Sequence, residues 1–126
     1  MEIKTLLEQR GLLIFDGAMG TQLQAKGLKT GETPELLTLT AKDLLKEIHR
    51  SYIDAGADII SANTFGANSY KLSHSDKSVD EIITAGIINC KEAIKESGKD
   101  VFCALDIGPI GQLLEPTGSL KFEEAY

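Results

Sequence analysis

Three short polar segments hold the side chains that could carry chemistry, and the first is DGAMGT, directly after the apolar run LLIF. The carboxylate of Asp16 can accept a hydrogen bond from an amine. The backbone N–H groups of residues 17–20 can meet a carboxylate, because glycine permits close approach of the backbone. Together these groups suit the zwitterionic head of an amino acid. The candidate residues are Asp16, Gly17, Ala18, Met19, Gly20 and Thr21.

Two other interpretations of this segment stay open on the residues alone. The glycines could cradle a nucleotide phosphate, but they fit neither the dinucleotide-binding fingerprint nor the P-loop pattern, and the helix pattern that follows is poor and short. The segment could also be a plain tight turn that Asp16 caps.

The other two segments follow the apolar runs at residues 57–62 and 101–105. The first contains Asn63, Thr64 and Phe65, and the side-chain amide of Asn63 and hydroxyl of Thr64 can both donate and accept hydrogen bonds. The second contains Asp106 and Gly108. Each segment could instead serve only to start a turn.

The remaining reactive side chains favour structural roles. His49 lies beside apolar positions of a predicted helix, so we expect it to be packed rather than catalytic. Cys90 falls on an apolar helix stripe and Cys103 in mid-strand, which predicts core positions. With no third ligand near either cysteine and no CxxC spacing, we expect neither a metal site nor a disulfide framework.

The elements that must position these segments alternate along the chain. Apolar runs at 12–15, 57–63 and 101–105 predict strands, and helices are predicted over 2–10, 41–55 (Thr40 as N-cap) and 78–97 (Ser78 and Glu81 as capping box). Residues 22–40 read as irregular, and Ser119 as the N-cap of a helix that the chain end interrupts. This order predicts a parallel α/β sheet, whose strands carry their ligand-binding residues at one edge.

Composition excludes several classes of function. The chain has 126 residues, 42% of them hydrophobic, and a net charge of −6, so it lacks the basic surface expected for nucleic-acid binding. It has no apolar run of about 20 residues that could cross a membrane and no apolar segment typical of a signal peptide. We therefore expect a cytoplasmic protein with no nucleic-acid or membrane partner.

Taken together, LIFDGAMGT, IHRSYIDAGADIISANTFGANSYKL and DIGPIGQLLEPTGSLKFEEAY resemble the homocysteine S-methyltransferase family. Within it, the chain is most similar to the N-terminal module of cobalamin-dependent methionine synthases. The resemblance implies a (β/α)8 TIM barrel, which needs about 250 residues. Residues 1–126 would then be one partial domain, the N-terminal part of a homocysteine-binding barrel with about three β/α units.

The resemblance also implies a substrate pocket. Residues 16–21 would lie against the amino-acid part of homocysteine, and Asn63, Thr64, Phe65, Asp106 and Gly108 would line the same pocket. Two positions depart from the family pattern: Thr38 stands where members often carry asparagine, and Ile110 where they often carry threonine. These departures affect loop contacts rather than the fold, and they leave open a different methyl donor or acceptor.

The resemblance further implies zinc, held by three cysteines that come later in such barrels and match neither Cys90 nor Cys103. Zinc would deprotonate the homocysteine thiol, whose pKa is otherwise about 8.5. Cobalamin and methyltetrahydrofolate would act through other domains of the parent protein or a separate corrinoid protein. This piece alone would then contain no catalytic residue and be inactive.

Several alternatives remain at this stage. The methyl donor could be betaine or S-methylmethionine, or the chain could belong to a related corrinoid methyltransferase. From other functional classes, the chain could be an association-prone piece with unpaired sheet edges, or a small nucleotide-binding α/β protein.

Overall fold

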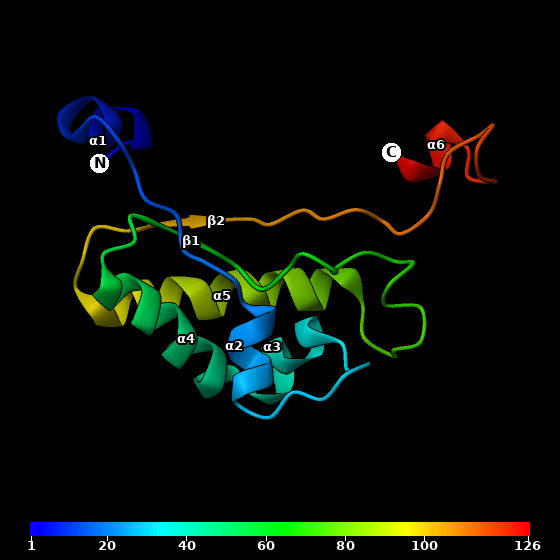
Figure 1. Ribbon diagram of the computed structural model, residues 1–126, viewed down its shortest axis with the longest axis horizontal. Coiled ribbons are helices and arrows are strands. Elements are labelled where there is room, and N and C mark those ends of the chain that lie inside the picture. Colours follow the sequence, from blue (N-terminus) through cyan, green and yellow to red (C-terminus); the bar gives the residue numbers. More distant parts are fainter.

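The computed structural model describes all residues 1–126 and shows helices around a small parallel sheet (Figure 1). The elements in chain order are α1 (Ile3–Arg10), α2 (Gly20–Ala25), η1 (Pro34–Leu36), α3 (Leu37–Thr40), α4 (Lys42–Ala55), β1 (Ile59–Ser61), α5 (Val79–Ser97), β2 (Phe102–Ala104) and α6 (Phe122–Ala125). The order strand–helix–strand with parallel pairing confirms the predicted α/β class.

The sheet has β1 at its centre. On one side β1 pairs in parallel with β2, and Ile60 lies opposite Cys103. On the other side the carbonyl of Ile14 accepts hydrogen bonds from two N–H groups, and Asp16 donates to the carbonyl of Ile59. The predicted strand at 12–15 was therefore too long, because only the bridge between Phe15 and Ile59 forms. Leu12 and Ile14 are more than half exposed, so their side chains are not packed between two layers as those of a buried strand would be.

Helices α4 and α5 form the layer that covers one face of the sheet (Figure 1). Their predicted bounds are correct to within one residue, since apolar side chains recur on one stripe of each helix. Ser78 and Glu81 form the predicted capping box of α5. Between this layer and the sheet, a core cluster is buried that contains Ile53, Ile60 and Cys90.

Three predictions about local structure were wrong. Residues 22–40 contain α2, η1 and α3 rather than irregular chain, because Leu23, Glu35 and Thr38 are buried in tertiary contacts that no periodicity reveals. Thr40 does not cap α4: it ends α3, and its hydroxyl donates to the carbonyl of Leu36. The last helix begins after Lys121, whose N–H donates to Glu124, and not after Ser119.

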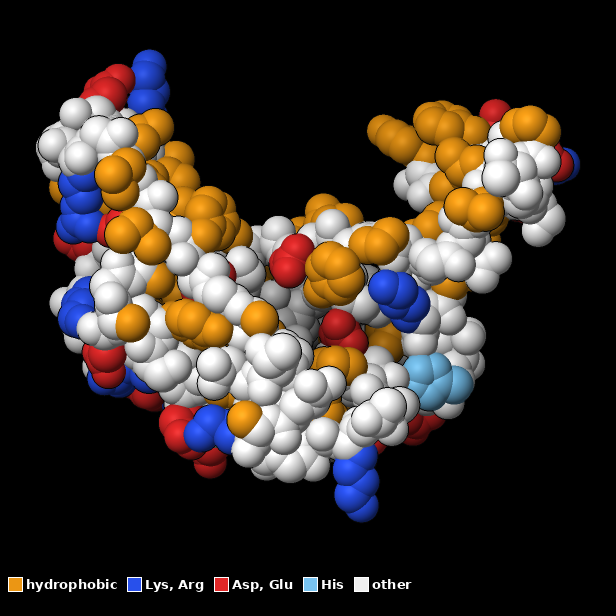
Figure 2. Space-filling model, in the orientation of Figure 1, with side chains coloured by type: hydrophobic (Ala, Val, Ile, Leu, Met, Phe, Trp, Pro, Cys, Tyr) orange, Lys and Arg blue, Asp and Glu red, His pale blue; other side chains and the backbone are white.

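Both ends of the chain rise on the side of the sheet away from α4 (Figure 1). Figure 2 shows this side hollowed between the two arms, with hydrophobic side chains on their inner surfaces. The largest exposed apolar side chains include Leu12, Phe15, Ile107 and Phe122. None of the helices combines the length and hydropathy needed to cross a bilayer.

Candidate functional site

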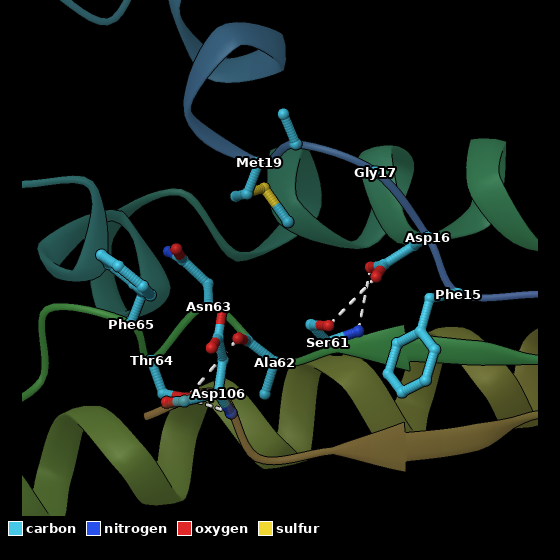
Figure 3. Close-up of a pocket in the computed structure, with 11 residues that line it drawn as sticks. Phe15, Asp16, Gly17, Met19, Ser61, Ala62, Asn63, Thr64, Phe65 and Asp106 are labelled. Carbon is cyan, nitrogen blue, oxygen red and sulfur yellow. Dashed lines mark hydrogen bonds between the residues drawn. The ribbon is translucent and has the colours of Figure 1, made fainter. Parts of the chain in front are cut away.

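A cavity of about 200 Å³ lies where the ends of β1 and β2 meet the segment after residue 15 (Figure 3). Parallel strands present their carboxyl ends at one edge, so three segments distant in sequence converge there. The residues that line the cavity are Phe15, Asp16, Gly17, Ala18, Met19, Ser61, Ala62, Asn63, Thr64, Phe65 and Asp106.

The structure brings together most of the residues proposed from sequence, but not all. Gly20 and Thr21 lie outside the cavity lining because they begin α2. Gly108 lines a neighbouring cavity, and its N–H donates to the carbonyl of Phe65 at 3.1 Å. Sequence reasoning missed Phe15, Ser61 and Ala62. Ser61 could have been found, because alternation along a strand places it on the same side as Asn63.

Asp16 is held at the cavity by Ser61 (Figure 3). Its Oδ2 accepts the Ser61 N–H at 2.9 Å, and its Oδ1 accepts the Ser61 hydroxyl at 3.0 Å. Partial burial raises the pKa of Asp16, the hydrogen bonds from Ser61 lower it, and the nearby charge of Asp106 raises it further, with a net upward shift. Each carboxylate oxygen has two lone pairs, so Asp16 keeps the capacity to accept from a cationic ligand.

The backbone that follows Asp16 offers hydrogen-bond donors. The N–H groups of Gly17, Ala18 and Met19 donate to no acceptor within the chain. Tyr52 fixes this segment, because its hydroxyl donates to the carbonyl of Ala18 at 2.8 Å. A Cβ at Gly17 would lie 3.0 Å from the Tyr52 hydroxyl oxygen, so a larger residue would require Tyr52 to shift by a few tenths of an ångström.

Asn63 and Thr64 direct their donors into the protein. The Thr64 hydroxyl donates to the carbonyl of Asp106 at 2.8 Å and accepts the Asp106 N–H at 3.1 Å, which ties the ends of β1 and β2 together. The Asn63 amide donates to the carbonyl of Pro34 at 2.9 Å and to the Thr38 hydroxyl at 3.1 Å. Both side chains therefore shape the wall of the cavity.

A buried polar network behind this wall was not predicted. Glu35 is almost entirely buried, and its Oε1 accepts the Gly66 N–H at 2.7 Å. Asn89 on α5 donates to the carbonyl of Thr38 at 2.9 Å. Because buried polar groups are costly unless they are paired, these contacts fix η1 and α3 against the turn at 63–66.

The titratable groups expected in the core are found there. His49 is completely buried, neither ring nitrogen has a hydrogen-bond partner, and burial lowers its pKa from 6.5 to about 4. Cys90 is buried and Cys103 half-buried, both as free thiols. No three His, Cys, Asp or Glu side chains gather as a ligand set. The residues present therefore do not fit a zinc site.

Comparisons with known proteins give the chain a family context. The sequence model described as homocysteine S-methyltransferase matches residues 13–126. The methionine synthase of Mycobacterium tuberculosis is 44% identical over 73 residues, which are 53% of this chain and 6% of that protein. The methionine synthase of Mycobacterium leprae is 46% identical over 68 residues, which are 49% of this chain and 6% of that protein.

Two solved structures of a homocysteine methyltransferase share the fold of this chain. The metallated form of the homocysteine methyltransferase MmuM from Escherichia coli superposes with a TM-score of 0.78 at 22% identity, over 86% of this chain and 42% of that one. The oxidised form gives 0.74 at 21% identity. At this identity the likeness establishes the fold alone. The matched part of the chain covers less than half of each of these proteins.

Proposed function

The chain belongs to the homocysteine S-methyltransferase family, and from this premise we propose that its cavity binds the amino-acid part of homocysteine. In the parent protein, a methyl group would be transferred to the homocysteine sulfur to give methionine. The family match gives no support to the alternative of a small nucleotide-binding protein.

One observation carries this proposal: a carboxylate and three successive residues whose N–H groups have no acceptor in the chain line the same small cavity. Asp16 presents negative charge, which suits an ammonium group. The N–H groups of Gly17, Ala18 and Met19 have no acceptor in the chain, which suits a carboxylate. An α-amino acid carries both groups on one carbon, so it can satisfy the two sides at once.

This chain would orient the substrate rather than activate it. A thiol must lose its proton to become a good nucleophile. The residues that line the cavity include no histidine that could act as a base, and they form no set of metal ligands. We propose that zinc ligands come from sequence beyond these 126 residues, in the remainder of a (β/α)8 barrel. Residues 1–126 would then be the N-terminal part of that domain, without methyltransferase activity of its own.

The methyl donor is proposed from the relatives. Because the sequence relatives are methionine synthases, we favour methylcobalamin, presented by a cobalamin domain or a corrinoid protein and recharged from methyltetrahydrofolate. Betaine and S-methylmethionine remain alternative donors. None of the cavity residues described above distinguishes among them.

The test is a binding comparison on the 126-residue chain by NMR titration. L-homocysteine should perturb the amide signals of residues 16–19 and 61–64. Removing its amine (4-mercaptobutyrate) or its carboxylate (3-mercaptopropylamine) should weaken binding at least tenfold each. Asp16→Asn should reduce affinity for homocysteine and for the amine-only analogue, but not for the carboxylate-only analogue. Asp76→Asn, at a side chain 88% exposed, is the matched control. Equal affinity for all three ligands would exclude the proposed pocket.

We also propose that the isolated chain self-associates. Leu12, Ile107 and Phe122 expose 60%, 82% and 66% of their surface, and Figure 2 shows hydrophobic side chains gathered on the inner surfaces of the hollow. Apolar surface gathered in this way is typical of a face that another layer covers.

A further inference from the structure

The two cysteines lie on the same side of the sheet, although twelve residues and a turn separate them in sequence. Cys103 is the register partner of Ile60 in the parallel β1–β2 pair, so their side chains leave the sheet on one face. Ile60 packs in the core cluster with Cys90, and Cys103 packs against that cluster. The Cys90 thiol donates to the carbonyl of Ile60 at 3.8 Å.

Nothing in the proposed homocysteine site uses this pair. Neither cysteine lines the cavity at the strand ends, and no other His, Cys, Asp or Glu joins them to make a metal site. No short sequence motif brings the two cysteines together. It arises because α5 packs its buried stripe against β2.

The two thiols are electrostatically unequal. Interaction with the neighbouring Cys103 thiol, together with burial, raises the pKa of Cys90. The same interaction, with Cys90 as its partner, lowers the pKa of Cys103 below its usual value, and the charge of Lys91 acts in the same direction. Cys103 is also the more accessible of the two, since Cys90 is completely buried. The nucleophilic thiolate therefore forms on Cys103, with Cys90 behind it as a second thiol.

We propose that Cys90 and Cys103 form a reversible intramolecular disulfide between α5 and β2, with a low-molecular-weight disulfide as the oxidant. The Cys103 thiolate attacks one sulfur of that disulfide, breaks its S–S bond and releases one thiolate. The Cys90 thiol then loses its proton to the released thiolate and attacks the Cys103 sulfur, which expels the second small thiolate; this thiolate takes up the proton that Cys103 had lost. The protein dithiol loses two electrons and two protons, and the small disulfide is reduced to two thiols.

This modification would act on the strand that precedes Asp106. Cys103 lies three residues before Asp106, on the strand whose end is tied to Thr64. A covalent link from α5 to β2 would fasten this strand to the helix layer. The inference does not depend on homocysteine binding, so either proposal can fail without the other.

The experiment is peptide mapping by mass spectrometry of the 126-residue chain after incubation with oxidised glutathione. We expect a loss of two hydrogens and a peptide pair joined through Cys90 and Cys103, reversed by reduced glutathione. Cys90→Ser should stop at a glutathione adduct on Cys103, and Cys103→Ser should react at least tenfold more slowly. The internal bond in the wild-type chain tests the proposal even if one of the variants fails to fold.

Three results would overturn the proposal. The first is a stable glutathione adduct on the wild-type chain without the internal bond. The second is a joined peptide pair that forms only in urea, which would show that folding separates the thiols. The third is a pair of mixed isotopic composition from equal amounts of ¹⁵N-labelled and unlabelled chain, which would show that the bond forms between copies.

Discussion

Ser61 donates two hydrogen bonds to Asp16, one from its backbone N–H to Oδ2 at 2.9 Å and one from its hydroxyl to Oδ1 at 3.0 Å. This contact joins the segment after residue 15 to β1 and aims the carboxylate at the cavity (Figure 3). It also opposes the upward pKa shift that burial imposes on Asp16.

The first prediction is that Ser61→Ala raises the pKa of Asp16 further. The hydroxyl bond that holds the ionised carboxylate is lost, while the backbone bond remains. The free energy of unfolding should fall by about 1 kcal/mol at neutral pH, as expected for one hydrogen bond to a charged group at a half-buried site. NMR titration of the Asp16 carboxyl carbon measures the pKa, and Ser75→Ala is the control. An unchanged or lowered pKa would contradict this role of Ser61.

The second prediction concerns two glycines with opposite surroundings. A Cβ at Gly66 would lie 2.7 Å from Glu35 Oε1, whereas a Cβ at Gly20 would meet nothing within 4 Å. Gly66→Ala should therefore displace the glutamate and lower the free energy of unfolding by about 1–3 kcal/mol. Gly20→Ala should leave it unchanged or slightly raised. Urea denaturation of both variants measures the difference, and equal stabilities would show that the Glu35 contact is not tight in solution.

The third prediction is a loss of stability in acid caused by His49. Its pKa is about 4 in the folded chain and 6.5 when unfolded. Above pH 6.5 the imidazole is neutral in both states and has no effect. As pH falls from 6.5 to 4, the unfolded chain binds a proton that the folded chain does not, so stability decreases. The full loss below pH 4 is about 3 kcal/mol.

This pH dependence should depend on His49 itself. His49→Leu should reduce the difference between the free energies of unfolding at pH 7 and pH 4.5, each measured by urea denaturation. The control His74→Gln, at an exposed histidine hydrogen-bonded to Thr33, should keep the wild-type slope. If both variants keep the slope, His49 is protonated in the folded chain, contrary to its burial without partners.

The fourth prediction is concentration-dependent association of the isolated chain. Sedimentation equilibrium should show dimers or larger species, and Leu12→Ser combined with Ile107→Ser should weaken association at least tenfold, because both are large apolar side chains that are more than half exposed. Ile88→Ser on α5 is the control, since α5 lies on the opposite side of the sheet. A wild-type chain that stays monomeric at high concentration would contradict the prediction.

The sequence by itself determined the helices α4 and α5, the α/β order and the edge at which the candidate site lies. These features are local or periodic. The stripe that includes Ile82 and Cys90 predicts α5, and Ser78 with Glu81 predicts its start, because the interactions that stabilise them are a few residues apart.

Only the tertiary structure decided which polar groups face the cavity. Thr64 bonds to Asp106 and Asn63 to Pro34 and Thr38, so residues that looked like ligand contacts in sequence direct their donors into the protein. Ser61 was overlooked, yet it positions Asp16. Pairing between groups 25 to 45 residues apart depends on how the segments pack, and no local pattern encodes it. The meeting of Cys90 with Cys103 has the same origin, since the packing of α5 on β2 creates it.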